Sequence, residues 1–236
     1  MSTSLAERLA LVEEGIAEAA RNAGRDVNDL TTIVVTKFHP AQLVRDLYDL
    51  GVRNVGENRH QEAEAKAAEL AELDLTWHFI GQLQSNKARA ARKYASVVHS
   101  VDRDSLVTAL GNAAFTPTGE PEDNVVPVLD CFVQLNLTQD PGRGGVQPAD
   151  VVELAERVAA QPSLNLLGVM AVAPLDEEPR VAFARVRAAS ERVQSVIPTA
   201  TFISTGMSHD YAAAISEGAT HLRIGSAITG NRPVSG

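Results

Sequence analysis

Short apolar runs alternate with longer amphipathic stretches along the chain, and this alternation predicts its secondary structure. The first stretch places Leu9, Val12 and Ile16 on one face, because residues three and four apart lie on the same side of a helix. Ser4 and Glu7 have the spacing of a capping box, which begins a helix. We therefore predict a helix near the N-terminus, ahead of the first strand.

Eight short apolar segments between the amphipathic stretches are the predicted strands. They cover residues 31–36, 54–56, 76–80, 96–101, 128–136, 165–172, 201–204 and 221–224. The first contains Ile33, Val34 and Val35, a β-branched run typical of a parallel strand covered on both faces. Strands separated by helices predict a parallel sheet with right-handed crossovers, either closed as a barrel or open and doubly wound.

Two observations favour the closed barrel over the open sheet. Eight is the strand number of the TIM-type barrel, and no GxGxxG turn follows the first strand, as a dinucleotide-binding sheet would require. Few residues remain after the eighth strand, so the N-terminal helix can fill the last place in the outer ring. We predict an α/β fold, a (β/α)8 barrel in which residues 1–236 form a single domain with an extra N-terminal helix.

Composition and charge exclude several classes of function. The formal net charge is −9 and no segment concentrates Lys and Arg, which disfavours nucleic-acid binding. No apolar segment is long enough to span a membrane, and Glu7 and Arg8 stand where a signal peptide requires an apolar run. The histidines lack a metal-ligand spacing such as HExxH, so no metal is predicted. We expect a cytoplasmic protein, and a monomer because nothing in the sequence demands an assembly.

Polar residues gather at the carboxyl ends of the predicted strands, where a barrel of this kind carries its active site. Lys37 directly follows the first strand. A lysine amine can form an imine with an aldehyde, whereas a guanidinium cannot. The alternative is a lysine that extends from the barrel rim into water. Position alone leaves both interpretations open.

Turns rich in glycine and hydroxyl residues follow the seventh and eighth strands. The first contains Ser204 and Gly206, and the second contains Gly225 and Ser226. Loops after strands seven and eight are the recurring phosphate site of this barrel, and amides at helix N-termini bind phosphate without a cationic side chain. Arg223, inside the eighth strand, requires a partner if buried: a ligand's ring nitrogen or a structural carboxylate. Together with Lys37, these features describe a site for pyridoxal 5′-phosphate (PLP).

Several motifs, in the right order, carry a family resemblance. They are VTKFHP (35–40), GEN (56–58), HFIGQLQSNK (78–87), STGMSHD (204–210) and RIGSAI (223–228). Over essentially its whole length the chain resembles the PLP homeostasis proteins, the YggS/PROSC family. The resemblance implies a barrel related to the N-terminal domain of alanine racemase, with PLP held as a Schiff base on Lys37.

The resemblance also implies roles for other residues. It places Ser204, Gly206, Gly225 and Ser226 around the phosphate and Arg223 opposite the pyridine nitrogen. Asn58, His78 and Met170 look like further cofactor-side residues. From the residues alone, His78 between Trp77 and Phe79 is better interpreted as a buried structural histidine. Lys87 is a candidate external phosphate site, although a solvated helix residue is the favoured interpretation.

The choice between enzyme and carrier depends on acid–base groups. An arginine opposite the pyridine nitrogen disfavours its protonation and makes the ring a poorer electron sink. Racemases of this fold take a second acid–base tyrosine from an added β-domain, whereas Tyr48, Tyr94 and Tyr211 each fall in a predicted helix and no segment is left for that domain. We therefore expect no catalytic residue and a non-catalytic cofactor-binding protein, and the family resemblance implies a carrier that buffers PLP and supplies it to PLP-dependent apo-enzymes. The alternatives are a weak racemase or decarboxylase, and a barrel with a vestigial site.

Overall fold

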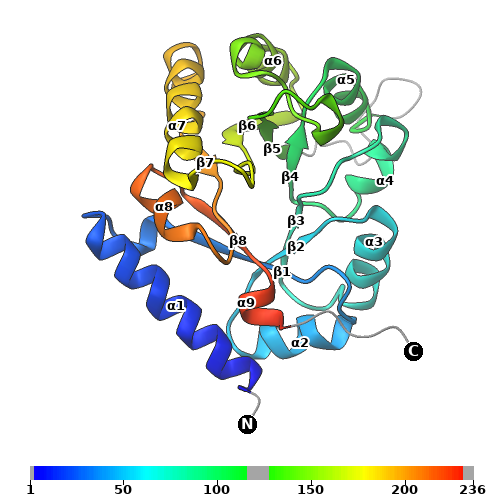
Figure 1. Ribbon diagram of the computed structural model, residues 1–236. Coiled ribbons are helices and arrows are strands. Elements are labelled where there is room, and N and C mark those ends of the chain that lie inside the picture. The colour runs from blue at the N-terminus through cyan, green and yellow to red at the C-terminus, as the bar shows by residue number, and fades with distance from the viewer. Residues whose placement is uncertain (1–2, 116–127, 231–236) are drawn as a thin grey trace.

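Eight parallel strands close into a barrel in sequence order, and helices surround it (Figure 1). The computed structural model describes residues 3–115 and 128–230. The strands are β1 Thr31–Val35, β2 Asn54–Glu57, β3 Thr76–Phe79, β4 Val97–Val101, β5 Leu129–Gln134, β6 Leu164–Met170, β7 Phe202–Ser204 and β8 His221–Ile224. The predicted barrel is confirmed, and each predicted strand is present within two residues of its expected bounds.

The helices follow the strands in the expected alternation. They are α1 Leu5–Asn22, α2 Ala41–Asp49, α3 His60–Glu69, α4 Ala88–Ala91, α5 Asp104–Asn112, α6 Val151–Ala159, α7 Pro179–Val196, α8 Tyr211–Ser216 and α9 Ser226–Thr229, with 3-10 turns η1 Val27–Asp29, η2 Ser85–Lys87, η3 Pro141–Arg143 and η4 Pro148–Asp150. The prediction that Tyr94 lies in a helix was wrong. It lies in the turn after α4, because the chain must reverse there to enter β4 three residues later.

Buried apolar side chains form two clusters, a large one between the strands and the helices and a small one inside the barrel. On β8, Leu222 and Ile224 belong to the large layer between strands and helices. Since successive residues of a strand point to opposite faces, His221 and Arg223 face the interior. The interior apolar cluster is small and consists of Val97, Phe132 and Met170, with Leu167 packed against it. The barrel core therefore combines a few apolar side chains with buried polar ones.

The N-terminal helix occupies the place left beside the short α9, as expected. It packs against both α8 and α9 (Figure 1). A Cβ at Gly15 would lie 2.4 Å from the Tyr211 hydroxyl, so the side chain of Tyr211 on α8 packs directly on the backbone of α1 and would have to shift for a larger residue there. Arg8 Nε donates a hydrogen bond to the Ile228 carbonyl of α9 at 2.7 Å. The capping box of Ser4 and Glu7 is present at the start of this helix.

Candidate functional site

The turn after β1 presents Lys37 at the carboxyl end of the barrel. His39 N–H donates to the Thr36 carbonyl at 3.1 Å, which closes a four-residue turn. Its third residue, Phe38, has φ +69°, the positive value that this position of a type II turn requires. Lys37 is half-buried, and its Nζ lies 5.8 Å from the Phe38 ring centroid. Within the described part of the chain the Lys37 amine has no hydrogen bond or ion pair, so it is available to a ligand.

A buried ionic cluster lies directly beneath this turn. Lys66 Nζ donates to Glu57 Oε1 at 2.7 Å, to the Thr36 carbonyl at 2.9 Å and to Glu62 Oε1 at 3.1 Å. Glu62 Oε1 also accepts the Phe38 N–H at 2.6 Å. Burial raises the pKa of Glu57, and the bond from Lys66 opposes that rise. The sequence analysis missed Lys66 and Glu62; their i,i+4 spacing on α3 was the available signal.

The turns after β7 and β8 meet at the same edge of the barrel. The Arg223 amide donates to the Gly206 carbonyl at 2.9 Å, which ties the turn after β7 to strand β8, two residues before Gly225. A Cβ built at Gly225 would lie 3.7 Å from Val35 Cβ, two residues before Lys37. Gly225 precedes α9 and Ser226 begins it, so their amides stand at a helix start, where N–H groups lack intrahelical partners. Lys37, Gly206, Gly225 and Ser226 are therefore brought together.

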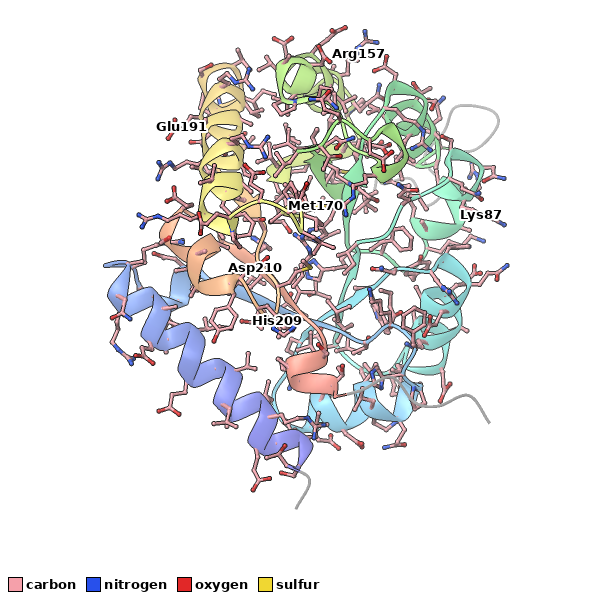
Figure 2. The ribbon with its side chains drawn as sticks, in the orientation of Figure 1. Lys87, Arg157, Met170, Glu191, His209 and Asp210 are labelled. Carbon is pink, nitrogen blue, oxygen red and sulfur yellow. The ribbon has the colours of Figure 1, made fainter. Side chains whose placement is uncertain are left out.

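Gly206 is held in a conformation and a space that exclude other residues. Its φ is +94°, and a Cβ there would lie 2.7 Å from Ala214 Cβ on α8. The same turn carries His209 and Asp210, which Figure 2 shows near the centre of the molecule, where Asp210 Oδ1 accepts the Met207 N–H at 2.5 Å. The backbone of the turn is thus fixed by its own contacts.

Arg223 lies in the barrel interior, and three of its N–H groups donate hydrogen bonds to the protein. Its Nη1 donates to the carbonyl and the hydroxyl of Ser204, both at 2.7 Å, and its Nη2 donates to the Ala171 carbonyl at 2.8 Å. The partners are thus carbonyls and a hydroxyl, and no carboxylate contacts it among the described residues. Burial lowers the pKa of Arg223 to about 10, so the guanidinium remains charged at neutral pH. Of its five N–H donors, Nε–H and one Nη2 hydrogen have no acceptor in the described chain.

A chain of hydrogen bonds continues from Arg223 through two histidines. Ser204 Oγ lies 2.9 Å from His99 Nδ1, and His99 Nε2 lies 2.9 Å from His78 Nδ1. His78 Nε2 lies 3.0 Å from Asn54 Oδ1. Burial lowers the pKa of His78 to about 3 and holds the pKa of His99 well below its ordinary value, so both rings are neutral.

Because both histidine rings are neutral, the donor and the acceptor of each hydrogen bond in this series are fixed. Asn54 Oδ1 can only accept, so His78 donates through Nε2 and accepts through Nδ1 from His99. His99 Nδ1 then accepts the Ser204 hydroxyl hydrogen. Because that hydrogen is already donated inward, a phosphate would have to compete for it. His78 also lies in the interior, with 3% of its surface exposed. His99 and Asn54 were not singled out by the sequence.

Met170 and Asn58 lie at different depths of the mouth. Met170 ends β6, is buried against Phe132 and Val97, and lies near the barrel axis in Figure 2. Asn58 follows β2, and its carbonyl would lie 2.1 Å from any Cβ at Gly81, so the loops after β2 and β3 are in close contact. Asn58 lines a cleft of about 610 Å³ together with Arg59, Gln82 and Lys87. Lys87 is half-buried and lines the same cleft.

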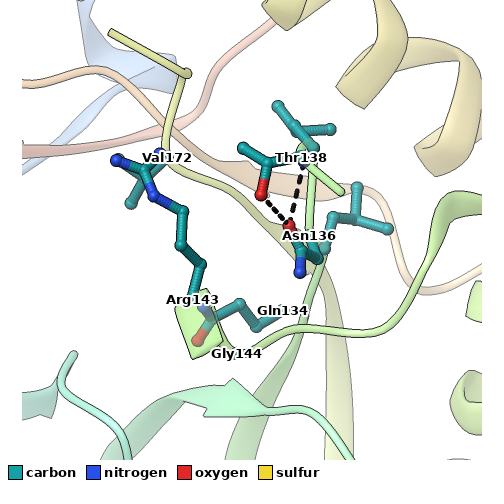
Figure 3. A pocket seen from close by; sticks show the side chains of 8 residues that line it. Gln134, Asn136, Thr138, Arg143, Gly144 and Val172 are labelled. Atoms are coloured by element: carbon teal, nitrogen blue, oxygen red, sulfur yellow. Dashed lines mark hydrogen bonds between the residues drawn. The ribbon is translucent and has the colours of Figure 1, made fainter. Parts of the chain in front are cut away.

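The loop after β5 closes another side of the mouth. Asn136 Oδ1 accepts the amide and the hydroxyl of Thr138, and Asn136 Nδ2 donates to the Asp140 carbonyl at 2.8 Å. Figure 3 shows Arg143 beside the pocket of about 180 Å³ that this loop lines. Asn136 therefore shapes the loop through its own contacts. Cys131 is buried in β5, and burial raises the pKa of its thiol to about 12.

No group of three His, Cys, Asp or Glu side chains is arranged to hold a metal ion in residues 3–115 and 128–230. Over the same residues, no helix combines the length and apolar character needed to cross a bilayer.

Comparison with known proteins places this chain in a family. Residues 15–233 match the family described as the alanine racemase N-terminal domain. A pyridoxal phosphate homeostasis protein of Pseudomonas aeruginosa is 42% identical, over 98% of this chain and 97% of the relative, and one of Mycobacterium bovis is 39% identical over 98% and 93%.

Solved structures agree with these relatives. PipY of Synechococcus elongatus, described with PLP bound, superposes with a TM-score of 0.80 at 34% identity, over 95% of this chain and 99% of PipY. Its structure without PLP gives a TM-score of 0.82 at 35% identity, with the same coverage of both chains. The chain therefore belongs to the family of the pyridoxal phosphate homeostasis proteins, whose barrel is that of the alanine racemase N-terminal domain.

Proposed function

We propose that this protein binds PLP as a Schiff base on Lys37 and takes part in the homeostasis and supply of the cofactor. The observation that carries the proposal is the Lys37 amine, which has no hydrogen bond or ion pair in the described chain and lies at the same barrel edge as the turns of Gly206 and Gly225. The relatives named for PLP homeostasis and the PLP-bound structure of PipY support it.

The residues at the mouth fit the cofactor. Amides at the start of α9, beside Gly225 and Ser226, are donors for a phosphate dianion, and Gly206 leaves room for close approach of the neighbouring turn. The free N–H groups of Arg223 are donors for an unprotonated pyridine nitrogen. Lys37 would hold the cofactor through an imine between its amine and the aldehyde carbon, with the aldehyde oxygen lost as water. When bound, PLP supplies an imine-linked aromatic ring that can accept electrons.

Two features support a carrier over an enzyme. Arg223 keeps its proton and its charge at neutral pH. It would therefore leave the pyridine nitrogen unprotonated, and the ring would remain a weak electron sink. Each tyrosine ring is engaged away from Lys37: Tyr48 stacks on the Arg53 guanidinium, Tyr94 contacts His60, and Tyr211 packs on α1. The alternative, a weak racemase or decarboxylase, would therefore need another acid–base group.

The finer aspects of the function are part of the same proposal. We propose that residues 1–236 act as one PLP-binding domain, that the protein is a cytoplasmic monomer, and that PLP-dependent apo-enzymes receive the cofactor. Size-exclusion chromatography with light scattering tests the monomer. Recovery of activity by an apo-enzyme mixed with the loaded protein, faster than by free PLP at the same free concentration, tests the transfer.

The central test uses visible absorption of the purified protein with added PLP. We expect an imine band in the wild type and none in Lys37→Ala. Borohydride should fix the cofactor to the tryptic peptide that contains Lys37. A colourless wild type, or a fixed adduct on another lysine, would refute the proposal.

Deuterium exchange separates the carrier from the enzyme. The loaded protein is incubated with amino acids in D2O, and deuterium at Cα is measured by NMR. We expect exchange no faster than with free PLP. Robust exchange that Lys37→Ala abolishes would establish the enzymatic alternative.

A further inference from the structure

The ammonium of Lys66 is saturated by three acceptors beneath the turn of Lys37. Its side chain is 7% exposed, and its contacts reach the turn after β1 through the Thr36 carbonyl, β2 through Glu57 and its own helix through Glu62. Thr36 Oγ1 donates to the same Glu57 oxygen at 2.7 Å. An ammonium has three N–H donors, so this cluster uses every one of them. The turn is thus attached to two other elements by buried charged groups.

Glu62 also fixes the backbone of the turn. Its Oε1 accepts the N–H of Phe38, the residue with φ +69°. A non-glycine residue in that region is strained and persists where its surroundings impose it. The bond to Phe38 and the bond from Lys66 share one carboxylate oxygen, so the strained peptide and the buried ammonium are directly coupled.

We propose that Glu57, Lys66 and Glu62 are positioning residues that hold the 36–39 turn so that the Lys37 amine meets the cofactor aldehyde. The inference rests on the proposed function and deepens it, because it identifies the residues that orient the Lys37 amine for imine formation. A purely structural role is the competing explanation. Buried ion pairs contribute little to stability compared with apolar packing, whereas strained backbone recurs at ligand sites.

Glu62 is the residue to change, because its side chain is 22% exposed and its removal leaves the bond between Lys66 and Glu57 in place. Glu62→Ala removes the acceptor of the Phe38 N–H, and Glu62→Gln keeps an acceptor oxygen without the charge. Glu153→Ala is the matched control, since Glu153 forms an exposed i,i+4 pair with Arg157 on α6, at 2.7 Å. Thermal unfolding of each variant reports whether the fold is kept.

Two ligands separate positioning from folding. PLP can form the imine, whereas pyridoxamine 5′-phosphate carries an amine in place of the aldehyde and uses only the phosphate and ring contacts. For Glu62→Ala we expect the Kd for PLP to rise about tenfold or more, since small misplacements of a reacting group cost up to about a hundredfold. The Kd for pyridoxamine 5′-phosphate should stay within about twofold. Glu62→Gln should recover part of the loss, and Glu153→Ala should change neither constant.

Each outcome decides the matter. An equal loss for both ligands, or no loss for either, overturns the positioning role. If the wild type itself yields no borohydride-fixed adduct on Lys37, the proposed function fails and takes this inference with it. An adduct in the wild type with unchanged variants refutes the inference alone.

Discussion

Replacing Gly206 by alanine should destabilise the protein through two effects that a matched control separates. Gly206 has φ +94°, and its new Cβ would lie 2.7 Å from Ala214 Cβ, closer than real Cβ atoms approach. The left-handed conformation costs about 1–2 kcal/mol for a residue with a Cβ, and overpacking costs about 1–3 kcal/mol. We expect Gly206→Ala to lower the free energy of unfolding by about 2–5 kcal/mol.

Gly218 provides the control, because it has the same backbone conformation in an open place. Its φ is +96°, and the nearest atom to a built Cβ is Ile203 Cδ1 at 3.8 Å. Gly218→Ala should therefore carry the conformational cost alone, about 1–2 kcal/mol. The difference between the two variants isolates the contact with α8.

Urea unfolding followed by circular dichroism measures both free energies, and PLP titration follows on the folded variants. Gly206→Ala should also weaken PLP binding, because relief of the clash moves the turn that we propose as part of the phosphate site. Equal destabilisation by the two substitutions would refute the packing argument. Unchanged PLP affinity in a measurably destabilised Gly206→Ala would remove this turn from the proposed phosphate site.

Three further predictions concern the barrel interior and the N-terminal helix. First, burial lowers the pKa values of His78, His99 and His221, to about 3 for His78 and about 4 for His221. Their contribution to the free energy of unfolding is therefore fully present above the unfolded pKa near 6.5 and is lost as the pH falls below it. His78 and His221 should each account for a loss of about 2 kcal/mol of stability at pH 5; urea unfolding at pH 7 and 5 checks this, and His99→Asn should flatten the slope. Second, Arg223→Met removes the guanidinium's bonds to the Ala171 and Ser204 carbonyls, which each keep one donor, the Thr205 hydroxyl and the Ala171 amide respectively, so the two lost bonds should together cost about 1–3 kcal/mol in unfolding free energy; a loss below 1 kcal/mol would show that the remaining donors suffice. Third, Arg8→Ala removes the bond to Ile228 that holds α9, and should raise the Kd for PLP severalfold at an unchanged absorption maximum. An unchanged Kd would show that α9 needs no such support.

Much of the fold followed from local sequence pattern. Alternating apolar runs and amphipathic stretches located the strands to within two residues, because parallel strands and their covering helices have distinct periodicities. The capping box of Ser4 and Glu7 and the glycine-rich turns after β7 and β8 were also legible, since they depend on neighbouring residues. The motifs around Lys37 and Arg223 were sufficient to suggest the family. The roles of the individual site residues remain predictions from sequence.

What surrounds those residues was decided by tertiary structure alone. Lys66 is an ordinary helix lysine by sequence, yet closure of the barrel places its ammonium under Thr36, thirty positions earlier. His99 and Ser204 are 105 positions apart and meet because β4 and β7 both face the barrel interior. The reason is physical: a sequence pattern reports which face of an element is apolar, whereas the partners of a buried polar group depend on which strands the barrel brings opposite one another.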